Sequence, residues 1–179
     1  MKRIKAYILT SIIVILFSSC EEKNNNSNYE RIYFPENFEL LNSNISNKDY
    51  IQKSKKFKFK IFTQINVSCA TCIQKLAKWQ NFIKQLDGCD SIYLIPVCKS
   101  KDKFELIKYL FESNKVGDLN FTLLLDTANT FGVLNKRYYD DMISESVLTN
   151  SEDQVLISGN PIENEIDRNK FLNSICTYK

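Results

Sequence analysis

The sequence predicts an α/β fold in which helices cover both faces of a central sheet. Segments of strand length alternate with segments of helical periodicity through most of the chain, and the order ends in a close pair of strands and a last helix. Several strand segments are apolar without interruption, which is typical of strands buried on both faces. These two observations indicate a layered sandwich of helices and sheet.

The first residues have the three parts of an export signal. A basic start at residues 2–5 is followed by an apolar run that ends at Phe17, and two serines then precede Cys20. The apolar run is shorter than the roughly 20 residues that span a bilayer. The segment resembles a bacterial lipoprotein signal, which implies that residues 1–19 are removed and that Cys20 carries the lipid. We therefore expect a protein of the cell envelope, anchored to a membrane at the periplasmic face or the cell surface.

The signal is followed by a polar segment and then by a stretch long enough for one domain. Residues 20–30 are rich in Asn and charged residues, with almost nothing apolar to bury, and are expected to form a disordered tether. Residues 31–179 have the length of one ordinary domain. The mature protein is therefore expected to be a single domain on a lipid anchor.

The first elements of the domain are an arm, a strand and a helix. Residues 29–49 are expected to pack as an irregular arm or as an edge strand around residues 31–34, and the aromatic and apolar residues from position 57 predict a strand that ends at Val67. Lys58 and Lys60 alternate with apolar residues in that strand, so we expect them to face solvent. Apolar residues then recur at helical spacing at positions 76, 79, 83 and 86, and Gly88 suits the end of that helix.

The second half of the domain continues the alternation. Residues 91–97 form an apolar run of strand length, and Asp102 is placed to cap a helix whose buried face lies between positions 104 and 111. The remaining expected elements are a strand at 121–125, a short helix at 129–135, strands at 146–149 and 154–157, and a helix at 166–175. Right-handed crossovers place the strands that end at Val67 and Val97 side by side, with their carboxyl ends at one edge.

A Cys-Ala-Thr-Cys motif lies between the first long strand and the amphipathic helix. Two residues three apart on a helical turn are roughly 5 to 6 Å apart at their Cβ atoms, so Cys69 and Cys72 need a small adjustment to form a disulfide. Unpaired N–H groups and the helix dipole at the N-terminus favour the thiolate of Cys69. The motif indicates thiol–disulfide exchange in which Cys69 attacks and Cys72 resolves.

The order of these elements resembles that of the thioredoxin-like oxidoreductases, specifically the exported, membrane-tethered redoxins. The resemblance covers residues 57–175 and rests on a strand, the CxxC motif, a long helix, a strand, and a later strand pair with a terminal helix. It implies a three-layer sandwich with a mixed central sheet. It also implies an oxidoreductase that needs no bound cofactor or metal, acts on disulfides of proteins or small thiols, and uses Cys69 as nucleophile and Cys72 as resolving residue.

The sequence departs from that family near the motif. Ser68 stands before the first cysteine, where Trp is common, and Ala70 and Thr71 stand between the cysteines, where Gly and Pro are common. The family places a cis-proline opposite the cysteine pair, and here a residue near Ile143 or Ser144 has to take that position. These departures bear on substrate docking and on the exclusion of metal rather than on disulfide chemistry.

Composition excludes several classes of function. The chain has no histidine, which removes Cys-His nucleophiles, haem attachment and imidazole-ligated metals. A four-cysteine zinc site needs a second close pair of cysteines, and Cys89 and Cys98 are far apart in sequence. Loss of the signal removes three basic residues, so that 24 − 3 = 21 basic residues face 21 acidic ones. This balance gives no reason to expect nucleic-acid binding.

The other cysteines leave several interpretations open. Cys98 ends a strand beside the expected site and is a possible accessory thiol, although a buried structural cysteine is the ordinary interpretation. Cys89 is expected to be structural or incidental. Cys176 lies near the end of the chain and is expected to have no role or to pair with another chain. If Cys69 and Cys72 form a static disulfide or stay idle, the protein is instead a non-catalytic surface lipoprotein that binds or scaffolds.

Overall fold

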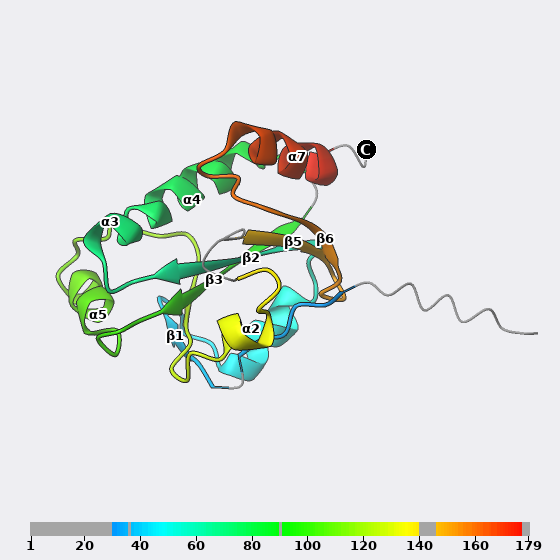
Figure 1. Ribbon diagram of the computed structural model, residues 1–179. Helices are drawn as coiled ribbons and strands as arrows, with labels where there is room; N and C mark the ends of the chain where they lie inside the picture. Colours follow the sequence, from blue (N-terminus) through cyan, green and yellow to red (C-terminus); the bar gives the residue numbers. More distant parts are fainter. Residues whose placement is uncertain (1–29, 36, 90, 140–145, 177–179) are drawn as a thin grey trace, which may run out of the picture.

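The computed structural model describes residues 30–35, 37–89, 91–139 and 146–176. Within these ranges a mixed sheet has the strand order β1-β4-β3-β2-β5-β6 (Figure 1). The strands are β1 (Glu39–Leu41), β2 (Phe59–Asn66), β3 (Ile92–Lys99), β4 (Leu123–Leu125), β5 (Ser146–Asn150) and β6 (Val155–Gly159). The predicted α/β fold with a mixed central sheet is confirmed.

The centre of the sheet is the parallel pair of β2 and β3. Their register runs from Phe59 opposite Ile92 to Asn66 opposite Lys99. β4 continues the parallel part beside β3, whereas β5 pairs with the other side of β2 in the antiparallel direction. The carboxyl ends of β2 and β3 therefore meet at one edge of the sheet, as the crossover rule predicted.

Helices cover both faces of this sheet and make the three layers. Residues from α3 (Ala70–Ile73), α4 (Lys75–Gln85), α5 (Glu105–Glu112) and α7 (Glu165–Cys176) pack into one hydrophobic core, and residues from α2 (Asn47–Ser54) and α6 (Phe131–Leu134) pack into a second. Figure 1 shows α4 and α7 on one side of the sheet. Successive residues of a strand point to opposite faces, so Ile61 joins the first core and Phe62 the second.

Helix α4 forms where the periodicity predicted it. Leu76 and Trp79 are each 1% exposed, and the Trp79 ring meets that of Phe82 edge to face at 5.7 Å between centroids. Gly88 follows the helix with φ at 87°, a left-handed conformation that costs glycine least. The buried stripe fixes α4 on the sheet and thereby fixes the short helix α3 that precedes it.

The N-terminal part of the domain differs from expectation. At residues 31–34 the structure has one bridge, between Arg31 and Gln154 beside β6, and the edge strand formed by this part of the chain is β1, which pairs with β4 at the opposite edge of the sheet. Helix α2 was not predicted. Ser46 caps α2 by accepting a hydrogen bond from the Asp49 N–H at 3.2 Å, and Tyr50 is fully buried. A polar helix of two turns with so few buried residues has no periodic apolar face to reveal it.

Lys60 is buried, so the expectation that it faces solvent is wrong. Its Nζ lies 2.5 Å from Asp153 Oδ1 and donates to the Ser151 carbonyl at 2.9 Å. Because β2 is covered on both faces, the ammonium has to find partners within the protein, and the β5–β6 turn supplies them. Lys58 is exposed, as predicted.

No helix in the described part of the chain has the length and apolar character needed to cross a bilayer. The expected signal and Cys20 fall within residues 1–29, which lie outside the described residues.

Candidate active site

Cys69 and Cys72 lie at the edge where β2 and β3 end. β2 ends at Asn66, Cys69 is the N-cap of α3, and Cys72 lies within that helix. Both side chains are partly exposed and both are free thiols. The strand and the helix therefore present the two sulfur atoms together at the surface, where the sequence predicted them.

Hydrogen bonds around Cys69 favour its thiolate. Its Sγ lies 3.0 Å from Thr71 Oγ1. The pKa of Cys69 is lowered from 9.0 to about 7, first by hydrogen bonding from the Cys72 side chain, then by the Thr71 side chain and the Cys72 backbone. The lowered pKa raises the fraction of Cys69 that is thiolate at neutral pH. The sequence suggested the helix N-terminus as the cause, and the structure adds the two side chains as the larger contributors.

The residue before the nucleophile is held by a polar network. Ser68 Oγ accepts a hydrogen bond from the Lys101 N–H at 2.6 Å, lies 3.1 Å from Ser100 Oγ, and donates to Asp102 Oδ1 at 3.1 Å. The Ser68 N–H donates to Asn66 Oδ1 at 3.0 Å. The pKa of Asp102 is lowered, first by the hydrogen bond from Ser100. The sequence pattern indicates only a capping role for Asp102 and carries no signal of its contact with Ser68.

The residues that the family resemblance places opposite the cysteine pair lie outside the described residues. Ile143 and Ser144, where the resemblance calls for a cis-proline, belong to residues 140–145. The described chain resumes at Ser146, whose Oγ donates to Thr63 Oγ1 at 3.2 Å between β5 and β2. None of the described peptide bonds is cis.

Cys98 lies under the site rather than on its surface. It pairs with Ile65 and Leu125 in the middle of the sheet and belongs to the core beneath α4. Burial raises the pKa of the Cys98 thiol far above its usual range. The possible accessory role of Cys98 stays a prediction, and in this conformation its thiol is closed to solvent.

Cys176 forms a disulfide with Cys89, which corrects the expectation that Cys176 is idle or pairs with another chain. The two Cα atoms are 4.9 Å apart, within the range for disulfides, although 87 positions separate the residues in sequence. α7 packs beside α4, so its last residue reaches the turn that follows α4 (Figure 1). The sequence holds no signal for this pairing, because it depends on how two distant helices pack.

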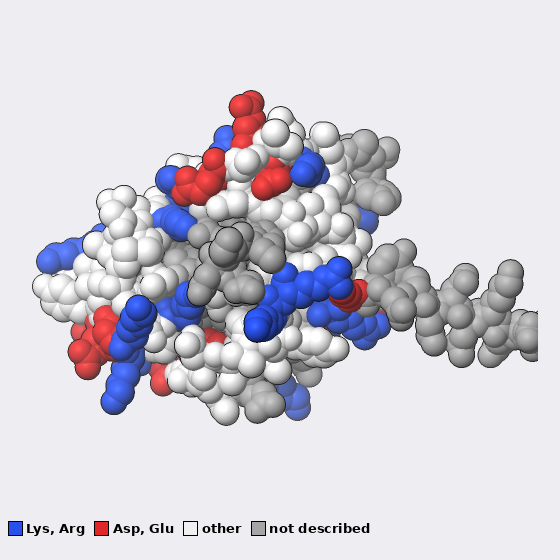
Figure 2. Space-filling model, in the orientation of Figure 1, with Lys and Arg blue, Asp and Glu red and all other residues white. Residues whose placement is uncertain are grey.

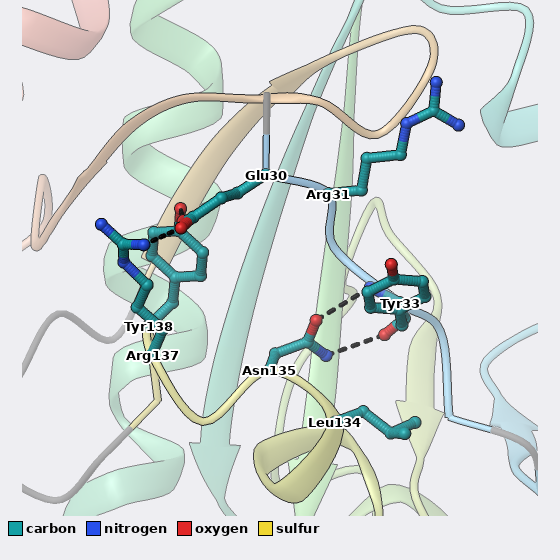
Figure 3. Close-up of a pocket in the computed structure, with 7 residues that line it drawn as sticks. All are labelled: Glu30, Arg31, Tyr33, Leu134, Asn135, Arg137 and Tyr138. Carbon is teal, nitrogen blue, oxygen red and sulfur yellow. Dashed lines mark hydrogen bonds and ion pairs between the residues drawn. The ribbon is translucent and has the colours of Figure 1, made fainter. Parts of the chain in front are cut away.

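A cavity of about 320 Å³ lies over the second core, between the N-terminal arm and the segment after α6 (Figure 3). Asn135 exchanges two hydrogen bonds of 2.8 Å with the backbone of Tyr33, and Glu30 contacts both Arg137 and Tyr138. The polar groups around the cavity thus pair with one another and tie the arm to the domain.

Charge and metal-ligating groups are dispersed. Figure 2 shows acidic and basic side chains interspersed over the visible face. Among the described residues, no three Cys, Asp or Glu side chains cluster in a way that suits a metal ion.

Comparison with known proteins gives matches of structure but not of sequence. No family model and no curated protein matches the chain. A solved thiol-disulfide isomerase from Corynebacterium glutamicum is similar at a TM-score of 0.59 and 12% identity, over 85% of this chain and 99% of that one. A candidate thiol-disulfide oxidoreductase from Bacteroides vulgatus is similar at a TM-score of 0.53 and 14% identity, over 83% and 99% of the two chains.

A third similar structure is of a protein described as thioredoxin-like. An uncharacterized thioredoxin-like protein from Porphyromonas gingivalis is similar at a TM-score of 0.50 and 15% identity, over 67% of this chain and 76% of that one. At identities this low, the similarity is one of fold.

Proposed function

From its thioredoxin-like fold, we propose that this chain is a thiol–disulfide oxidoreductase that uses Cys69 and Cys72. The observation that carries the proposal is the pair of partly exposed free thiols at the start of α3, one of which has its pKa lowered to about 7. The thiolate is the attacking form in disulfide exchange, and a lowered pKa increases its fraction near neutral pH.

The proposed exchange moves two electrons and uses no bound cofactor. The Cys69 thiolate attacks one sulfur of a substrate disulfide, so that a mixed disulfide forms and the other substrate sulfur leaves as a thiolate. Cys72 then loses its proton and attacks the Cys69 sulfur, which releases the second substrate thiolate. The protein ends with a Cys69–Cys72 disulfide and the substrate with two thiols. The reverse sequence oxidises a dithiol substrate.

The proposed setting is the cell envelope, with the lipid on Cys20 as membrane anchor and residues 20–30 as tether. The N-terminal sequence pattern supports this, since it has the basic, apolar and small-residue parts of an export signal. The Cys89–Cys176 disulfide supports it independently, because such bonds persist mainly in oxidising compartments. The proposed substrates are accordingly disulfides or thiols of proteins and small molecules outside the cytoplasm.

Trapping of the mixed disulfide tests the proposal. In Cys72→Ser the second step is blocked, so we expect Cys69 to stay joined to substrate proteins when the variant is expressed in its own cell envelope. These adducts should disappear on reduction and should be absent from the matched variant Cys69→Ser. If Cys72→Ser forms no more adducts than Cys69→Ser, the pair is idle and the protein is a binding or scaffolding module.

A further inference from the structure

Between the end of β2 and Cys69 the chain leaves the sheet, and hydrogen bonds to side chains hold it there. The ladder to β3 ends with the hydrogen bond from the Val67 N–H to the Lys99 carbonyl at 3.0 Å. Beyond this point the Ser68 N–H turns to the side chain of Asn66, and the Ser68 hydroxyl contacts the loop that follows β3. The backbone that leads into the nucleophile is thus held by the Asn66 side chain and by the Ser68 hydroxyl, and the hydroxyl alone ties it to the loop after β3.

The loop that holds Ser68 has a strained conformation. Lys103 and Phe104 have φ angles of 54° and 67°, which side chains with a Cβ rarely adopt, and Phe104 is nevertheless buried. Ser100 Oγ stabilises this path by accepting from the N–H groups of Asp102 and Phe104 at 3.0 and 2.9 Å. Such consecutive outliers persist only where surrounding contacts over-determine them.

Asp102 connects the loop with the next helix. Its Oδ1 accepts from Ser68 and from Ser100, and its Oδ2 accepts from the Leu106 N–H at 3.2 Å in the first turn of α5. α5 is in turn anchored in the first core by the fully buried Ile107. A chain of hydrogen bonds therefore runs from a rigid helix, through the strained loop, to the residue next to Cys69.

We propose that Ser68 is a positioning residue for the nucleophile, and that the loop of Ser100 and Asp102 holds it in place. Cys69 has an extended backbone, with φ at −135° and ψ at 122°, and its side chain makes no capping hydrogen bond to the helix. The Cys69 carbonyl accepts from the Ile73 N–H at 3.0 Å, so the helix holds this residue on one side and the chain through Ser68 holds it on the other. Together they set the direction of the Cα–Cβ bond, and this direction brings Sγ to Thr71 and Cys72. Because the thiolate depends on these two contacts, a small rotation at residue 68 weakens them together. The inference deepens the proposed function and rests on it.

The test measures the ionisation of Cys69 directly. The rate of Cys69 alkylation by iodoacetamide, resolved by mass spectrometry, is followed against pH in the wild-type protein and in Ser68→Ala. We expect the midpoint to rise by about half a pH unit or more in Ser68→Ala, which halves the thiolate fraction at neutral pH. Ser68→Thr keeps the hydroxyl and should restore the wild-type midpoint. Ser100→Ala removes the support from the loop and should shift the midpoint in the same direction.

A matched control separates positioning from general loosening. Ser113 Oγ donates to the Tyr109 carbonyl at 2.7 Å at the far end of α5, so Ser113→Ala removes a hydroxyl from the same unit without touching the loop. An unchanged alkylation midpoint in Ser68→Ala overturns the proposal. An equal shift of the midpoint in Ser113→Ala overturns it as well. So does a Ser68→Thr variant that keeps the wild-type melting temperature but does not restore the wild-type midpoint.

The alkylation assay also separates this proposal from the proposed function. If the midpoint shifts as expected but Cys72→Ser traps no substrate, Ser68 positions a thiol that does no exchange, and the oxidoreductase proposal alone fails. If trapping succeeds and the midpoint does not move, the positioning role alone fails.

Discussion

Loss of the Cys89–Cys176 disulfide should destabilise the domain strongly, since the bond closes a long loop. In the chain-entropy model, a separation of 87 residues corresponds to about 4 to 5 kcal/mol at 25 °C, because the unfolded chain regains the freedom that the cross-link removes. For a domain of this size the expected fall in melting temperature is about 10 to 15 °C. The bond joins the turn after α4 to the end of α7, so its loss frees the last helix first.

The assay compares urea unfolding of two proteins that both carry serine at positions 69 and 72, which prevents exchange. One keeps the Cys89–Cys176 bond, and the other has Cys89→Ser and Cys176→Ser. The protein that keeps the bond should unfold at the higher urea concentration. The difference between the two urea midpoints should equal the disulfide's contribution of about 4 to 5 kcal/mol divided by the slope of the unfolding free energy against urea. A difference below about 1 kcal/mol would refute the reasoning, because the native protein then either lacks the bond or gains nothing from the closed loop.

Three further predictions follow from individual contacts. Thr71→Val removes the hydroxyl beside Cys69 at nearly constant shape, so the pKa of Cys69 should rise from about 7 toward 9.0; an unchanged alkylation profile would contradict this. In the reduced protein the lowered pKa of Cys69 contributes stability that is fully present above pH 9.0 and is lost as the pH falls through about 7. The urea midpoint of the reduced protein, measured relative to that of the oxidised protein, should therefore rise as the pH increases from about 7 to 9.0. A difference that does not change with pH would exclude a lowered pKa of Cys69. Asp153→Asn keeps an amide oxygen near Lys60 but removes the carboxylate charge that faces the buried ammonium, and should cost about 3 kcal/mol, since Asn tolerates the φ of 64° at this position. An effect under about 1 kcal/mol in urea unfolding would show that the charge of Asp153 is dispensable.

The central part of the fold could be predicted because its signals are strong and local. The apolar residues at positions 76 and 79 recur at helical spacing, and both are buried where the period requires. β3 is a nearly continuous apolar run and β2 is rich in aromatic and β-branched residues, and crossover handedness is enough to place them side by side. The position of Cys69 and Cys72 at the sheet edge follows from these two facts.

The parts that escaped prediction depend on contacts between distant segments. The burial of Lys60 needs the β5–β6 turn, which supplies a carboxylate from far along the chain. The pairing of Cys89 with Cys176 needs the packing of α7 beside α4. The contact between Ser68 and Asp102 needs the register of β2 against β3 together with a strained loop. Neither periodicity nor spacing carries this information.

A redox titration of the mature protein without Cys20 tests the central claim most directly. The thiols of Cys69 and Cys72 are followed by alkylation and mass spectrometry across a glutathione or dithiothreitol series, with Cys89 and Cys176 resolved as separate peptides. We expect a reversible two-electron transition of the Cys69–Cys72 pair between about −270 and −120 mV. A pair that never forms a disulfide, or one that stays oxidised below about −300 mV, would contradict it and would leave a static scaffold.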